Sequence, residues 1–144
     1  MPDISKYMIK ASFFWLFAGG LTGALLLAEK AIPFWPAIWL FLPVHVSTMI
    51  FGWMLQFVLG VAYWMLPKYR QEPSRGRVLP AKVSLFALNT GVIISSAGHL
   101  APALGLSPPH AAAFLMAGYL LATAAVTTIA LLISPRIISY RGDY

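Results

Sequence analysis

The chain has 144 residues, of which 60% are hydrophobic and only 10% are charged. Soluble domains carry about a quarter charged residues, so this chain would leave a large apolar exterior in water. The absence of cysteine excludes disulfides, thiolate metal sites, iron–sulfur clusters and covalently attached c-type heme. The composition therefore predicts an integral membrane protein surrounded by the lipid bilayer.

Four stretches are long and apolar enough to cross a membrane, which takes about 20 helical residues for a hydrocarbon core of about 30 Å. They cover about residues 7–28, 38–66, 81–103 and 110–134. Prolines separate them: Pro67 closes the second span, Pro80 suits the first turn of the third, and Pro135 ends the fourth. Because strands in lipid leave backbone groups unpaired, we expect an all-α, four-helix membrane bundle that forms one domain over residues 1–144.

The basic residues predict the orientation. Nine of the ten fall on one side of the spans, namely Lys6, Lys10, Lys68, Arg70, Arg75, Arg77, Lys82, Arg136 and Arg141. The positive-inside rule then places both termini and the 67–82 loop in the cytoplasm. This placement accounts for the net charge of +6 without a nucleic-acid partner. We expect a multi-pass protein of the plasma (inner) membrane of a prokaryote.

Ionisable residues within spans are costly and usually functional. Glu29 and Lys30 fall at the outer end of the first span, where we expect both to be solvated. His45, His99 and His110 all fall toward the outer side. An ion such as zinc held by the three histidines is disfavoured, because no carboxylate accompanies them at that depth.

One face of the second span is patterned. At about 100° per residue, Met49, Gly52 and Gln56 project within about 40° of His45. A flat macrocycle held by His45 would need the gap that Gly52 leaves. The alternative is a histidine hydrogen-bonded to a neighbouring helix, with the glycine allowing close backbone approach.

Small residues elsewhere indicate helix packing. Gly19 and Gly23 form a G-x-x-x-G pair in the first span, and Gly118 and Ala122 begin a seam in the fourth. Such seams bring helices together within one chain or between chains. Asn89 is a mid-membrane polar residue with no evident partner in the sequence.

The segment HVSTMIFGWMLQFVLGVAYWMLPK, residues 45–68, resembles the second membrane helix of the catalytic subunit of the heme–copper oxidase superfamily, closest to its C-type oxidase and nitric oxide reductase branches. The matching features are His45, the M-I-F-G of residues 49–52, Gly60, the Tyr63–Trp64 pair and Pro67. In that family the histidine is an axial ligand of the low-spin heme, so the resemblance implies this role for His45. The other three spans match in hydropathy alone.

The departures from the family limit what the resemblance implies. In the family, later helices carry the high-spin heme ligand, the copper-binding histidines and the second low-spin ligand. This chain has three histidines altogether. We therefore expect neither a complete oxidase nor a complete reductase, and we assign no catalytic residue.

The sequence thus predicts a membrane cytochrome of b type that holds noncovalent heme b near the outer face and transfers electrons with a quinone or a redox protein. The expected cofactor-binding residues are His45, Met49, Gly52, Gln56 and His99, with His45 and His99 as iron ligands. The second axial ligand is left open between His99, His110 and His45 of a second chain.

Four helices enclose little volume for a macrocycle, so we expect a homo-oligomer, with a dimer favoured over a trimer. Two alternatives remain: a heme-free accessory or assembly subunit of a respiratory complex, and a heme-based gas-binding or sensing protein with a single protein ligand.

Overall fold

The computed structural model describes residues 1–68 and 77–139, and within them the chain is all helical, with no strand. In chain order the elements are α1 (Asp3–Ala31), the 3₁₀ helix η1 (Pro36–Phe41), α2 (Leu42–Ser47), the π-helix η2 (Thr48–Leu55), α3 (Gln56–Met65), α4 (Val78–Leu100), the 3₁₀ helix η3 (Ala101–Leu104) and α5 (Pro108–Ser139).

Four continuous helical runs in the described part of the chain are long and apolar enough to cross a membrane. They are Asp3–Ala31, Pro36–Met65, Val78–Leu104 and Pro108–Ile137. The predicted spans 7–28, 81–103 and 110–134 lie inside three of these runs. The prediction 38–66 begins two residues after the start of Pro36–Met65 and ends one residue beyond it. The all-α class and the four membrane-length helices are therefore confirmed.

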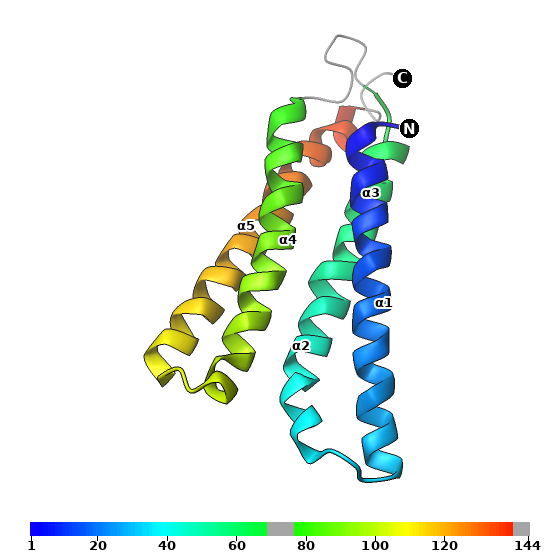
Figure 1. The fold of residues 1–144 in the computed structure, drawn as a ribbon. Helices are drawn as coiled ribbons and strands as arrows, with labels where there is room; N and C mark the ends of the chain where they lie inside the picture. The colour runs from blue at the N-terminus through cyan, green and yellow to red at the C-terminus, as the bar shows by residue number, and fades with distance from the viewer. Residues whose placement is uncertain (69–76, 140–144) are drawn as a thin grey trace.

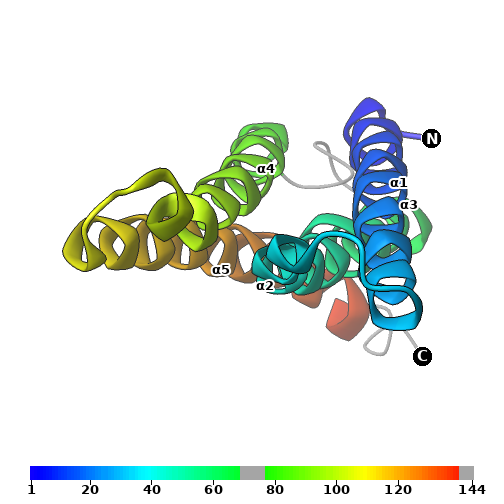
Figure 2. The same ribbon diagram turned by 60° about the horizontal axis from the view of Figure 1, so that its bottom comes forward.

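The helices form two hairpins (Figure 1). The first pairs α1 with the run from η1 to α3, which we call the second span, and the other pairs α4 with α5. The second span lies between α1 and α5 (Figure 2). The start of α1, the end of α3, the start of α4 and the end of α5 lie at one end of the bundle, which we call the terminal end. The opposite end, which we call the loop end, carries the connections within each hairpin.

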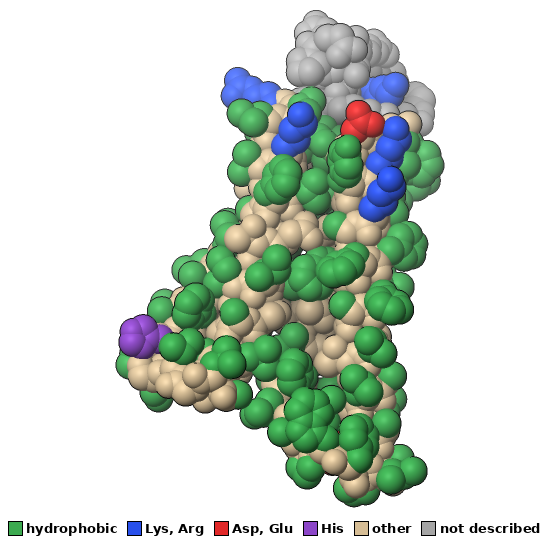
Figure 3. All heavy atoms as spheres, viewed as in Figure 1, with side chains coloured by type: hydrophobic (Ala, Val, Ile, Leu, Met, Phe, Trp, Pro, Cys, Tyr) green, Lys and Arg blue, Asp and Glu red, His purple; other side chains and the backbone are tan. Residues whose placement is uncertain are grey.

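The two hairpins join most closely at the terminal end. A buried cluster there takes side chains from all four helices: Ile4, Met8, Leu59, Tyr63, Ala81, Leu85, Ile129 and Ile133. At the loop end the hairpins splay apart (Figure 1). In Figure 3 the visible Lys and Arg side chains gather at the terminal end, while apolar side chains cover the flanks.

Glycines set the distance between α1 and the second span. A Cβ added at any of four positions would lie within 3.0 Å of a side chain of the opposite helix: Gly19, Gly23, Gly52 and Gly60. The predicted G-x-x-x-G pair therefore packs within the chain. Glycines also hold α4 against α5, because a Cβ at Gly91 would lie 2.7 Å from the carbonyl oxygen of Gly118.

Arg136 of α5 ties the terminal end together. Its side chain is 1% exposed, and it donates to the backbone oxygens of Tyr63 at 3.1 Å, of Pro67 at 2.8 Å and of Leu66. The last carbonyls of a helix lack intrahelical donors, and the residue four positions after Tyr63 is Pro67, which has no N–H. The guanidinium thus caps α3 from another helix, a role that counting basic residues did not reveal.

The prediction that Pro135 ends the fourth helix is wrong, because α5 continues to Ser139. A proline inside a helix deprives the carbonyl four residues earlier of its donor, here that of Leu131. Ser134 Oγ donates to this carbonyl at 3.2 Å. The replacement hydrogen bond helps to explain why the helix passes the proline.

Two further expectations need correction. The second span is not one regular α-helix, since η2 is a π-helix. Glu29 is not solvated: it is 4% exposed, and its Oε2 accepts hydrogen bonds from the backbone N–H groups of Phe34 at 2.7 Å and Trp35 at 2.6 Å. The carboxylate fixes the turn that leads into η1. Lys30 is exposed, as expected.

Replacing Arg136 should destabilise the fold. Hydrogen bonds from a charged donor contribute roughly 1.5–3 kcal/mol each, so Arg136→Ala should clearly lower the unfolding midpoint in detergent, followed by circular dichroism. Arg136→Lys should restore only part of the loss, because an ammonium does not reproduce the planar fork of donors. Arg77→Ala, at an exposed position, is the control and should change little. Equal midpoints for the Arg136 and Arg77 variants would contradict the capping role.

Gly52 and Gly20 form a matched pair for testing the contact between α1 and the second span. A Cβ at Gly52 would lie 2.6 Å from Trp15 Cγ, whereas a Cβ at Gly20 would meet nothing within 4 Å. Overpacking a closed contact costs about 1–3 kcal/mol, so Gly52→Ala should lower the unfolding midpoint and Gly20→Ala should not. Equal effects of the two substitutions would show that Gly52 does not lie in a close contact.

Candidate functional site

His45 lies on α2 with its imidazole against α1. Its Nδ1 lies 2.7 Å from the carbonyl oxygen of Gly19, and a Cβ added at Gly23 would come within 2.6 Å of its Cε1. A carbonyl oxygen can only accept a hydrogen bond, so Nδ1 carries the proton and donates it. In the neutral ring, Nε2 then keeps its lone pair, and it has no hydrogen bond to the described residues. The ring is half-buried, so it is not sealed inside the protein.

The other predicted residues of the second span also face α1. Met49 packs on Gly19, since its Sδ would lie 2.8 Å from a Cβ there. Gln56 is fully buried, and its Nε2 donates to the carbonyl oxygen of Met8 at 3.3 Å. The structure thus brings His45, Met49, Gly52 and Gln56 onto one face, and that face is the contact with α1.

The gap at Gly52 is filled by a tryptophan. The side chain of Trp15 lies directly over this glycine. Its Nε1 donates to Asn89 Oδ1 of α4 at 2.7 Å, and Asn89 Nδ2 donates to the carbonyl oxygen of Leu85 at 2.7 Å. Asn89 therefore has the partner that the sequence did not reveal, and the hydrogen bond fixes the indole. A macrocycle lying over Gly52 would have to displace this ring.

The π-helix begins three residues after His45. π-Helices are rare and often occur at functional sites. Thr48 Oγ1 donates to the carbonyl oxygen of His45 at 2.9 Å, and the backbone N–H of Thr48 is shared between this carbonyl and that of Val44. Thr48 Oγ1 also faces α1, 2.9 Å from the position of a Cβ at Gly19. The backbone of His45 and its ring are thus both tied by hydrogen bonds.

The other two histidines lie elsewhere. His99 of α4 is half-buried against α5, where its Nε2 lies 2.8 Å from the hydroxyl oxygen of Tyr119. His110, at the start of α5, is exposed, and its Nδ1 lies 2.6 Å from Ser107 Oγ. Within the residues that the structure describes, no three His, Asp or Glu side chains come together as ligands for one ion.

His45 and His99 do not face one another. Ser47 Oγ and Ser95 Oγ lie 3.3 Å apart, so Ser47 marks the side of α2 that faces α4. Two residues along an α-helix correspond to about 200° of rotation, so His45 points about 160° away from that side. The body of the second span therefore separates His45 from His99.

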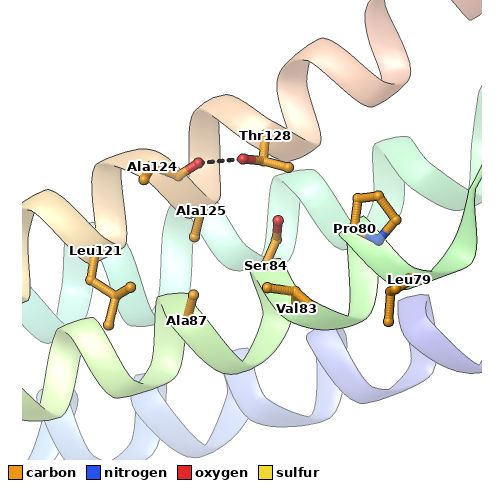
Figure 4. A pocket seen from close by; sticks show the side chains of 9 residues that line it. All are labelled: Leu79, Pro80, Val83, Ser84, Ala87, Leu121, Ala124, Ala125 and Thr128. Atoms are coloured by element: carbon orange, nitrogen blue, oxygen red, sulfur yellow. Dashed lines mark hydrogen bonds between the residues drawn. The ribbon is translucent and has the colours of Figure 1, made fainter.

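A groove of about 410 Å³ lies between α4 and α5, on the terminal side of their closest contact (Figure 4). Most of its lining is apolar: Leu79, Pro80, Val83, Ala87, Leu121, Ala124 and Ala125, together with Ser84 and Thr128. Thr128 Oγ1 donates to the carbonyl oxygen of Ala124 at 2.7 Å. Because the lining includes no histidine, methionine or carboxylate, the groove supplies no ligand for iron.

The partner of His45 was missed, although the sequence contained a signal for it. Gly23 lies eight residues before the end of α1 at Ala31, and His45 lies nine residues after the start of η1 at Pro36. In adjacent antiparallel helices these offsets give similar depths, so the sequence would have supported a contact between the G-x-x-x-G pair and the histidine. Trp15 carried no comparable signal, because only the fold brings it over Gly52.

Comparisons of the chain with models of known families, with curated proteins and with solved structures gave no match.

The geometry of His45 is testable without any cofactor. Gly23→Ala places a methyl group where the imidazole lies, so the ring should move and lose its hydrogen bond to Gly19. Nitrogen-15 NMR of labelled histidine should show an Nδ1-protonated ring in the parent protein, because a hydrogen bond to a carbonyl fixes this tautomer. The signal should change in Gly23→Ala and persist in Gly20→Ala. An unchanged signal in Gly23→Ala would contradict the placement of the ring.

Proposed function

We propose that this chain is a membrane cytochrome of b type that binds noncovalent heme through His45 near the outer face and serves in electron transfer. The observation that carries the proposal is the hydrogen bond from His45 Nδ1 to the carbonyl oxygen of Gly19. Histidines that bind metals almost always donate their second ring N–H to a carbonyl or carboxylate, which fixes the tautomer and leaves the other nitrogen for the metal. His45 has this arrangement.

Three features of the chain support heme as the bound group. An imidazole whose Nδ1 donates to a carbonyl can offer its Nε2 to heme iron. Gly23 lacks the Cβ that would occupy the place of the ring. The segment 45–68 resembles the helix that carries a low-spin heme ligand in the heme–copper oxidase superfamily. Heme, when bound, supplies one-electron chemistry, and the residues of this chain hold and orient its ligand.

The proposed orientation follows from charge. The basic residues of the described chain lie mainly at the terminal end, which the positive-inside rule assigns to the cytoplasm. His45 lies nine residues after the start of η1 at the loop end, so it falls in the outer part of the span. With a second imidazole on the iron, no position is open to a substrate, which suits electron transfer.

The alternative of a heme-free accessory or assembly subunit is favoured by one observation. Trp15 fills the space at Gly52 that a macrocycle along the second span would use, and Asn89 holds it there. In that case the hydrogen bond between His45 and Gly19 would serve only to join two helices. The absorption spectrum of the protein distinguishes these two functions.

Replacing His45 should abolish heme binding. The protein purified in mild detergent from heme-replete cells should show the oxidised and reduced spectra of low-spin heme b. His45→Ala should lack them, because the iron loses its ligand, whereas His110→Ala should retain them. Circular dichroism should show that both variants are folded. A colourless parent protein, or low-spin heme in His45→Ala, would refute the proposal.

A further inference from the structure

A low-spin b heme needs two axial ligands, and under the proposed function His45 supplies one of them. The sequence contains three histidines, and all three lie in the described residues. The positions of the other two, His99 and His110, decide whether the second ligand of the iron can come from the same chain.

His99 is unsuitable as the same-chain partner of His45. Its Nε2 is engaged with the hydroxyl of Tyr119, and its ring packs edge-on to the tyrosine ring with centroids 6.0 Å apart. His45 points about 160° away from the side of α2 that faces α4, which carries His99. One iron cannot bind both side chains of the same chain in this arrangement.

His110 is unsuitable for a different reason. It opens α5 at the far tip of the α4–α5 hairpin, where the two hairpins splay apart (Figure 1). Its ring is exposed and pairs with Ser107 of the preceding turn. No described contact brings it toward α1 or α2, where the ring of His45 lies.

We propose that the second axial ligand is His45 of a second copy of this chain, so that a two-fold dimer binds one heme. This inference rests on the proposed function. Most homo-oligomers are two-fold dimers, in which the same surface patch of both copies meets. A residue near the axis of such a dimer lies close to its own counterpart.

The surface beside His45 is available for this contact. The neighbouring residues Leu42 and Val46 are 43% and 46% exposed, and the surface of α1 at Gly20 is open, with no atom within 4 Å of an added Cβ. The half-buried imidazole lies between these open surfaces of α1 and α2.

Two measurements test the inference in the intact protein. Native mass spectrometry together with a heme assay should find dimers with one heme per two chains and a low-spin spectrum. His99→Ala should leave the spectrum low-spin. One heme per chain, a monomer carrying low-spin heme, or conversion to high-spin by His99→Ala would overturn the shared site while leaving His45 as a heme ligand. A parent protein without heme would instead overturn the proposed function.

Mixed dimers give the sharpest test. Differently tagged parent and His45→Ala chains are co-expressed, and the heterodimer is isolated by both tags in turn. With a shared site, this heterodimer has one ligand and should lack low-spin heme. The matched heterodimer of parent and His110→Ala chains should retain it. Low-spin heme in the His45→Ala heterodimer would show that each chain completes its own site, and would overturn the inference.

Discussion

The close packing of α1 on the second span is the constraint on which the rest of the structure depends. Lipid provides no hydrophobic drive between helices, so they associate through van der Waals contact and interhelical hydrogen bonds. Here glycines on both helices allow this contact: Gly19 and Gly23 from one side, Gly52 and Gly60 from the other. The same closeness lets an imidazole of one helix reach a backbone carbonyl of the next, so the packing and the candidate site have one cause.

Polar contacts then fix how the α4–α5 hairpin sits on this pair. Trp15 and Asn89 join α1 to α4 in the middle of the bundle, and Ser47 meets Ser95 nearby. Arg136 joins α5 to the end of α3. Hydrogen bonds are directional, so they fix the position of the α4–α5 hairpin relative to α1 and the second span, which apolar contacts alone do not define. Toward the loop end the hairpins separate, and Leu42 and Val46 of α2 are exposed there.

Hydropathy and proline positions were enough to predict four spans to within a few residues, because length and apolarity determine what a membrane helix can be. Predictions from local sequence were wrong at two positions where hydrogen bonds to neighbouring residues change the outcome. Pro135 does not end α5, since Ser134 serves the carbonyl that the proline leaves free. Glu29 is buried because the backbone of the following turn binds it.

The face of the second span that carries His45, Met49, Gly52 and Gln56 was predicted from periodicity, but the side chains that cover this face come from α1. No single-helix pattern contains that information.

If the chain binds heme as proposed, the packing of α1 on this face limits where the macrocycle can lie. One helix face cannot both pack on α1 and lie along a macrocycle, and Trp15 already fills the place at Gly52. Under the proposed function, the iron would therefore have to be reached from the part of His45 that remains exposed, beside the exposed Leu42 and Val46. A monomer would leave the other side of the iron to lipid or to a gas molecule. A second copy, in contrast, would cover that side and supply the missing imidazole. Under the proposed function, assembly and ligation are therefore one event, and loss of the dimer should convert the heme from low-spin to an open, gas-accessible form.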